Sequence, residues 1–180
     1  MEQNTKQVNI RPSTRKLTVC ALLAALGAVL GIISLPLPAL TAGGYSVKIG
    51  ITVLPVILAA VLYGPAHGGM VGAIVDLLPA LLIPKGPFVP WFTIIGALFG
   101  VIPGLFFIHG NEPCFKRILA AVAAGQLTCS VLLNTLLLTS LYGLPYQIIY
   151  VRLLNQAIMI PVYTILTYYA VRLLKKGAVI

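Results

Sequence analysis

The chain has 180 residues, of which 59% are hydrophobic and 8% are charged, with a formal net charge of +9. A soluble domain has about 25% charged residues, so this chain cannot cover a water-facing surface. Composition therefore excludes an ordinary soluble protein and predicts a single integral membrane domain. The positive charge does not indicate nucleic acid as a partner, because the basic residues lie between hydrophobic runs, as topology signals do. The three cysteines have neither the even number nor the spacing of a disulfide framework or metal site.

Hydropathy predicts six membrane-spanning helices, each near the ~20 residues that cross ~30 Å of hydrocarbon. In chain order they cover residues 17–37, 49–64, 66–83, 91–108, 118–141 and 148–173, and the second is the shortest. The predicted fold is an all-α six-helix bundle over residues 17–173, between a basic segment (1–16) and a short tail (174–180). The first span resembles a secretory signal peptide, but its apolar run exceeds the roughly 7–15 residues of such a peptide.

Basic residues are distributed unequally between the two sides of this predicted bundle. If all six spans cross, both termini share one side, and that side collects nine basic residues: Lys6, Arg11, Arg15, Lys16, Lys116, Arg117, Arg172, Lys175 and Lys176. The other side keeps Lys48 and Lys85, with Arg152 just inside it. Lys and Arg are in excess in cytoplasmic loops, so the sequence predicts a multi-pass cell-membrane protein with both termini cytoplasmic.

Small residues recur every four positions in the first span, at Ala21 and Ala25, at Ala24 and Ala28, and at Gly27 and Gly31. Faces of this kind let another helix approach closely in lipid. Two interpretations stay open: packing inside this protein, and docking of a separate membrane subunit.

Asp76 is an acidic residue inside the third span, seven residues before Ile83 and thus about 10 Å below the outer surface. A carboxylate at membrane depth is costly and is retained where it faces protein, water or ligand. Pro79, one turn later, frees the carbonyl of Val75 beside it, as happens where backbone lines a cavity. This combination predicts a ligand pocket near Asp76, with a simple helix kink as the alternative.

Polar residues on the last two spans share helical faces. Arg152, Asn155 and Gln156 lie on one face of the sixth span, and Ser130 and Asn134 lie on one face of the fifth. Asn134 comes out at a depth similar to that of Asp76, and Arg152 lies nearer the outer surface, at roughly 6 Å. Asp76, Asn134 and Arg152 are therefore predicted to converge on one outward-facing cavity. Interhelical hydrogen bonding, and a structural ion pair between Asp76 and Arg152, are the competing interpretations.

Aromatic residues accompany Pro and Gly in the connection between the third and fourth spans, at Phe88, Trp91 and Phe92. Aromatic side chains at this depth often form an interfacial belt. In a stiff loop above a pocket they can also stack on a flat ring, which is the functional alternative.

Several segments together resemble a known family, the substrate-binding S components of energy-coupling factor vitamin transporters, and within it the folate-specific members. They are Val47-Lys48-Ile49-Gly50, Leu54-Pro55, Leu62-Tyr63-Gly64-Pro65, Gly68-Gly69, Gly72, Asp76-Leu77, Leu82-Ile83-Pro84-Lys85-Gly86-Pro87, Arg152-Leu153-Leu154-Asn155-Gln156 and Ile158-Met159-Ile160-Pro161. The resemblance covers the chain from about residue 14 onward. It implies a receptor that captures a vitamin outside the cell, and the resemblance to the folate-specific members implies that this vitamin is folate.

The resemblance also implies partners: a transmembrane coupling protein, met by Ala21, Ala25 and Ala28 of the first helix, and two ATPase subunits. The chain lacks a GxxxxGK[ST] phosphate loop, so ATP hydrolysis is expected in those partners and the chain itself is not expected to be an enzyme. No cofactor or metal is expected.

Folate chemistry matches the candidate residues. The pterin ring presents two adjacent N–H donors that one carboxylate, Asp76, can accept. Its flat face would stack on Phe88, Trp91 or Phe92, while the two carboxylates of the glutamate tail would meet Lys48, Lys85 and Arg152, with Asn134, Asn155 and Gln156 as further contacts.

Other functions are not excluded by the sequence. An S component for riboflavin, pantothenate, thiamine or a queuosine precursor would share the same layout. An autonomous secondary transporter is less favoured, because no internal repeat or chain of titratable groups is present. A membrane enzyme would need a reactive motif such as GxSxG or HExxH, and the sequence contains neither.

Overall fold

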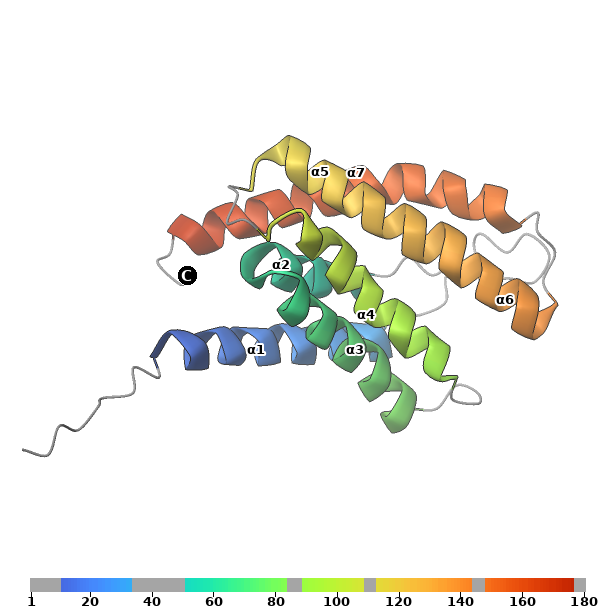
Figure 1. The fold of residues 1–180 in the computed structure, drawn as a ribbon, viewed down its shortest axis with the longest axis horizontal. Coiled ribbons are helices and arrows are strands. Elements are labelled where there is room, and N and C mark those ends of the chain that lie inside the picture. The colour runs from blue at the N-terminus through green and yellow to red at the C-terminus, as the bar shows by residue number, and fades with distance from the viewer. Residues whose placement is uncertain (1–10, 34–50, 84–88, 109–112, 144–147, 177–180) are drawn as a thin grey trace, which may run out of the picture.

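The computed structural model describes residues 11–33, 51–83, 89–108, 113–143 and 148–176, and these ranges contain helices and no strand (Figure 1). In chain order the elements are α1 (Arg11–Ile33), α2 (Val53–Tyr63), α3 (Pro65–Leu82), α4 (Pro90–Leu105), α5 (Phe115–Gly125), the π-helix η2 (Gln126–Leu133), α6 (Asn134–Tyr142) and α7 (Ile148–Lys176). Since α5, η2 and α6 follow one another without a break, they form one span. The described residues thus form a helical unit at each of the six predicted positions.

Four of these helical units are long and apolar enough to cross a membrane: Thr14–Ile33, Pro65–Leu82, Phe115–Leu141 and Arg152–Leu174. The other two, α2 and α4, have 11 and 16 residues and are equally apolar in character. The short second span predicted from hydropathy therefore corresponds to a short helix. The fold is that of an all-α integral membrane protein.

Helix boundaries differ from the predicted spans chiefly at polar ends. The first helix begins at Arg11, six residues before the predicted start at residue 17, and α7 runs to Lys176 rather than 173. Hydropathy detects lipid-facing residues and not the polar turns by which a helix continues into the interface. Residues 34–37 of the predicted first span lie outside the described part of the chain.

The helices pack as a bundle in which α4 lies between α3 and the α5–η2–α6 span, and α7 packs along α5 and η2 (Figure 1). Arg11 at the start of α1 and Lys176 at the end of α7 lie at the same end of the bundle (Figure 1). We call this the terminal end. The end of α3, the start of α4, the end of α6 and the start of α7 lie at the opposite end.

Glycines bring α3 and α4 into direct backbone contact. A Cβ atom at Gly72 would overlap the carbonyl oxygen of Gly96, and one at Gly100 would overlap that of Gly68. These four glycines form two rows with four-residue spacing, the small-xxx-small pattern that lets membrane helices approach closely. Close backbone packing fixes α3 against α4, and Asp76 lies on the same row one turn further along α3.

The small residues of α1 contact α3 and are largely used inside the protein. A Cβ atom at Gly27 would lie 2.5 Å from Val75 Cγ2, and one at Gly31 would lie 3.1 Å from Pro79 Cγ. Ala24 and Ala28 are also buried, at 4% and 5% exposure. One face of α1 therefore packs within the chain, as the first of the two interpretations predicted.

Candidate functional site

Asp76 is half-buried on α3 and faces α4. Its Oδ2 accepts a hydrogen bond from Thr93 Oγ1 at 3.0 Å, and a Cβ atom at Gly96 would lie 3.0 Å from Asp76 Cβ. An ionised carboxylate has two acceptor oxygens with about four lone-pair sites, so this bond uses part of its capacity. The carboxylate is thus held at the α3–α4 contact, with a structural partner that the sequence did not predict.

A hollow of about 340 Å³ lies between α4 and the η2–α6 segment. Its walls are largely apolar, with one tryptophan and one hydroxyl group: Trp91, Ile94, Ile95, Leu98, Leu133, Leu136, Leu137 and Ser140. This volume is within the range of small-molecule sites, about 300–1,000 Å³. Trp91 and Leu98 recur at seven-residue spacing, which places the hollow on a different face of α4 from Thr93 and Gly96.

A second polar cluster joins η2 to α7 through Ser130. Arg152 Nη1 donates to the Ser130 carbonyl oxygen at 3.0 Å, and Gln156 Nε2 donates to Ser130 Oγ at 2.7 Å. Arg152 is half-buried and Gln156 is 6% exposed. The predicted shared face of Arg152 and Gln156 is confirmed, and its partner on the fifth span is Ser130.

The Ser130 carbonyl that accepts Arg152 belongs to the π-helix, where the backbone bonding differs from that of an α-helix. In α-helical geometry that carbonyl would accept the N–H of Asn134, but this N–H bonds Cys129 O, the partner five residues back that marks π winding. Arg152 bonds the Ser130 carbonyl at this change of winding. The guanidinium of α7 is thus held at a backbone carbonyl of the π segment.

Buried polar atoms without a hydrogen-bond partner gather on the same two spans. Within the described ranges they include Asn134 Oδ1, Thr135 Oγ1, Thr139 Oγ1 and Gln156 Oε1. Nearly all buried polar groups in proteins have a hydrogen-bond partner. These four atoms have none within the described part of the protein, so a ligand or water would be the partner. Among the described residues, the η2–α6 segment and α7 thus carry buried polar atoms that a polar ligand or water would satisfy.

Four of the predicted site residues, Asp76, Trp91, Arg152 and Gln156, fall at three places on helix segments in the half of the bundle away from the terminal end (Figure 1). Asp76 lies at the α3–α4 contact, Trp91 lies at the hollow and is 59% exposed, and Arg152 and Gln156 lie at the η2–α7 seam. In place of the ion pair between Asp76 and Arg152, which was a competing interpretation, Asp76 contacts Thr93 and Arg152 contacts Ser130.

The remaining candidates are less constrained by the structure. Phe92 and Asn155 are half-buried on α4 and α7, and Asn134 begins α6 at the end of the π-helix. Lys48, Lys85 and Phe88 lie outside the described residues. Three residues that the sequence analysis did not place in the site are in contact with it or line it: Thr93, Ser130 and Ser140.

The three alanines proposed for a partner contact differ in exposure. Ala21 and Ala25 are exposed on α1, whereas Ala28 is 5% exposed and packs inside the chain. Leu22, Leu26 and Val29 are exposed beside them, at 65%, 52% and 50%. An outward face of α1 is therefore available at Ala21 and Ala25 but not at Ala28, because the helix turns Ala28 toward the core.

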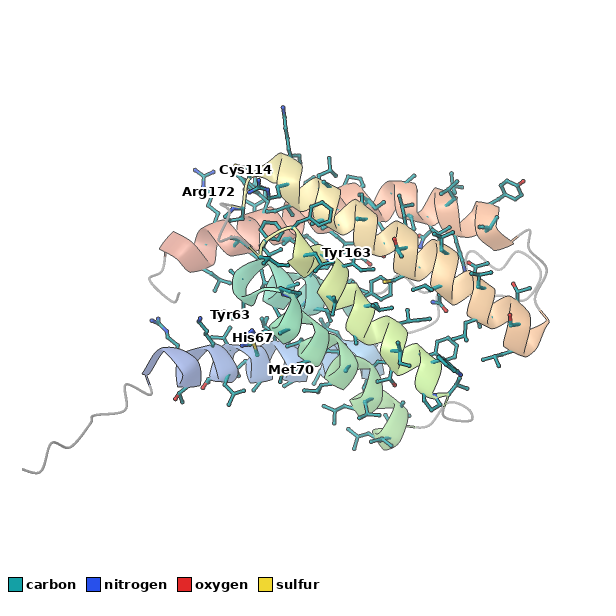
Figure 2. All side chains as sticks on the ribbon, in the orientation of Figure 1. Tyr63, His67, Met70, Cys114, Tyr163 and Arg172 are labelled. Atoms are coloured by element: carbon teal, nitrogen blue, oxygen red, sulfur yellow. The ribbon has the colours of Figure 1, made fainter. Side chains whose placement is uncertain are left out.

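His67 lies in the half of the bundle that holds the terminal end, together with Tyr63, Cys114 and Arg172 (Figure 2). Its Nδ1 is 3.0 Å from the Tyr63 carbonyl oxygen, and the two ring centroids are 5.9 Å apart. This imidazole thus has local structural contacts. His109 lies outside the described residues.

Comparison with known proteins assigns the architecture to a family. The family model described as "ECF-type riboflavin transporter, S component" matches residues 11–176. Folate transporter FolT of Clostridium novyi is 34% identical over 123 residues, covering 68% of this chain and 71% of FolT. Riboflavin transporter FmnP of Bacillus subtilis is 30% identical over 150 residues, covering 83% of this chain and 69% of FmnP.

A solved structure with the same fold is that of FolT bound with folic acid, with a TM-score of 0.70 and 26% sequence identity. The match covers 87% of this chain and 93% of that one. The shared fold therefore extends over most of this chain. The chain is a vitamin-binding S component and belongs to the ECF-type transporter family.

Proposed function

We propose that this S component binds folate and delivers it to an ATP-driven uptake complex. The observation that carries the proposal is the agreement, over 87% of the chain, with a FolT structure that contains folic acid. The curated folate transporter of Clostridium novyi, at 34% identity, supports the same substrate. Arg152 adds chemical support, because a half-buried guanidinium near the end opposite the termini suits a ligand with carboxylates.

Riboflavin is the second candidate, favoured by the family model and by the relative from Bacillus subtilis. Both vitamins have a flat ring that could enter an apolar hollow beside Trp91. They differ at the other end, since riboflavin has a neutral ribityl chain and folate has two carboxylates. A buried arginine is better matched by the carboxylates of folate.

In the proposed complex, aromatic side chains hold the ring and basic side chains hold the tail. Trp91, which lines the hollow, and Phe92 and Phe88 are the stacking candidates. The tail carboxylates would meet Arg152 with Lys48 and Lys85, and would have Asn134, Asn155 and Gln156 near them. Asp76 would accept the two pterin N–H groups after a rearrangement of its contact with Thr93.

The ligand role of Asp76 can be separated from its structural role. Asp76→Asn keeps a hydrogen-bond acceptor for Thr93 but removes the charged acceptor of the pterin donors. We expect folate affinity to fall about tenfold or more, as when a charge-assisted hydrogen bond is lost. Isothermal titration of the purified protein measures this change, with Thr93→Val as the control for the interhelical bond. Unchanged folate affinity in Asp76→Asn would leave Asp76 with the structural role alone.

Coupling to ATP hydrolysis is proposed to reside in partner subunits, a transmembrane coupling protein and two ATPases. Both chain termini are proposed to lie in the cytoplasm, in keeping with the excess of basic residues on that side. The shared position of Arg11 and Lys176 at one end of the bundle supports a common side (Figure 1). The exposed small residues Ala21 and Ala25 are proposed to contact the coupling protein.

The partner contact predicts a variant that binds vitamin but does not transport it. Ala25→Leu adds a bulky side chain to the exposed face of α1, so we expect folate uptake to fall at least about fivefold with unchanged folate binding. Uptake is measured in liposomes that contain the coupling protein and ATPases, with Ala157→Leu on the exposed side of α7 as the matched control. Equal uptake by Ala25→Leu and wild type would remove α1 from the interface, and uptake by the chain alone would contradict the need for partners.

Ligand identity is tested by what the protein retains on purification. Mass spectrometry of protein purified in mild detergent is expected to find a folate. Recovery of riboflavin in place of folate would transfer the proposal to the second candidate and keep the transporter class.

A further inference from the structure

Ser130 is a residue that the sequence resemblance did not single out, yet it makes contacts with both polar side chains of α7. Its hydroxyl accepts the Gln156 amide N–H at 2.7 Å, and its carbonyl accepts Arg152 at 3.0 Å. Arg152 and Gln156 are one helical turn apart, so their Cβ atoms are about 5–6 Å apart on one face. A single residue on η2 therefore holds two neighbouring ligand candidates in fixed positions.

The orientation of the Gln156 amide follows from this contact. Because Nε2 is bonded to Ser130, Oε1 points away from that bond, and it is buried with no hydrogen-bond partner within the described ranges. The side chain as a whole is 6% exposed. An unpaired buried acceptor is unfavourable and is relieved by an N–H donor. Gln156 thus presents an acceptor for a group that the protein does not contain there.

Arg152 supplies the complementary charge next to this acceptor. A guanidinium has five N–H donors in a planar fork, and the bond to the Ser130 carbonyl uses Nη1. That bond fixes the plane of the fork, so less side-chain freedom is lost when an anion binds. Together the two side chains offer an acceptor for an N–H and donors for a carboxylate.

We infer that Ser130 is a positioning residue for a subsite that binds an N-acyl amino acid, with the amide N–H on Gln156 and the neighbouring carboxylate on Arg152. An N-acyl amino acid has both groups attached to one carbon, which matches two side chains one turn apart. The inference rests on the proposed function, because the N-acylglutamate end of folate is such a group. Riboflavin has no amide N–H next to a carboxylate.

The test compares folate with pteroate, which lacks the glutamate and its amide N–H. Wild-type protein is expected to bind folate more tightly than pteroate. Ser130→Ala releases the Gln156 amide, so folate affinity is expected to fall about tenfold while pteroate affinity changes about twofold or less. Ser130→Thr retains the hydroxyl and is expected to restore the wild-type ratio. A purely structural loss would reduce both affinities together and leave the ratio unchanged.

Two further variants complete the experiment. Gln156→Met removes the acceptor at similar length and is expected to reduce the folate-to-pteroate ratio as Ser130→Ala does. Thr164→Ala is the matched control, because Thr164 is a fully buried hydroxyl of α7 that bonds its own helix at Ile160 O. An unchanged ratio in Ser130→Ala and Gln156→Met would overturn the role of Ser130, whereas wild-type protein that binds no folate would contradict the proposed function itself.

Discussion

Replacing Gly100 with valine is expected to destabilise the folded protein strongly and to lower its yield. A Cβ atom at this position overlaps the carbonyl oxygen and carbon of Gly68, and it would lie 2.7 Å from the Gly69 nitrogen. Backbone atoms cannot move aside as a flexible side chain can, so α3 and α4 would have to separate. Overpacking of this kind costs about 3 kcal/mol or more, a large part of a typical stability of about 5–15 kcal/mol.

The measurement is the yield of monodisperse protein on size-exclusion chromatography and its thermal midpoint in detergent. Leu105→Val is the matched control, because it also introduces a β-branched residue into α4, at a position that is 52% exposed. The control is expected to behave like wild type. If Gly100→Val had the same yield and thermal midpoint as wild type, α3 and α4 would pack less closely than in the structure.

Replacing Arg152 with glutamine is expected to reduce folate affinity by about 10–100-fold. The change removes the only arginine near the end of the bundle opposite the termini among the described residues, and with it the proposed charge-assisted contact to the folate tail. Glutamine retains an N–H donor for the Ser130 carbonyl, so the helix contact suffers less than the charge. Affinity for pteroate, which lacks the glutamate carboxylates, is expected to change less.

Arg172→Gln provides the control for this variant. Arg172 lies on the same helix but near the terminal end, where it is exposed (Figure 2). Folate affinity should therefore be unchanged, although the cytoplasmic charge that sets topology is reduced by one. If both arginine variants bound folate like wild type, the ligand carboxylates would have to meet Lys48, Lys85 or no basic residue at all.

Much of the fold was predictable from the sequence because the membrane imposes strong constraints. A membrane-spanning helix is apolar over about 20 residues and makes its backbone hydrogen bonds internally. Hydropathy alone therefore located six apolar helices and their order, including the shorter α2 and α4. Of the two interpretations left open for the small residues of α1, packing within the chain is confirmed for Gly27 and Gly31, whose partners are Val75 and Pro79 of α3. The residue pairs in contact could not be derived, since helix rotation depends on neighbours that a linear sequence does not specify.

The candidate site was predictable by residue type but not by geometry. Polar residues at membrane depth were expected to face the protein, and Asp76, Arg152 and Gln156 do so. The convergence of Asp76 with Arg152 was inferred from depth alone, which does not specify the side of the bundle. Depth placed both in the outer part of the bundle, whereas α4 lies between the α3 and η2 contacts that hold them.

The π-helix was not predicted from the sequence. Residues Gln126 to Leu133 read as part of an ordinary apolar helix, and the four-residue spacing of Ser130 and Asn134 was assessed with α-helical geometry. π winding changes the residues per turn and alters which carbonyl is available to a side chain. Short π segments are frequent at functional sites. Knowledge of the π winding would therefore have made Ser130 a candidate site residue.

The folate assignment is decided by calorimetric titration of the ligand-free, full-length protein with folate and with riboflavin under the same conditions. The account predicts saturable one-to-one binding of folate, with no measurable competition from riboflavin at equal concentration. Tight binding of riboflavin with no heat from folate would contradict it, and would leave Arg152 at the η2–α7 seam with a structural role.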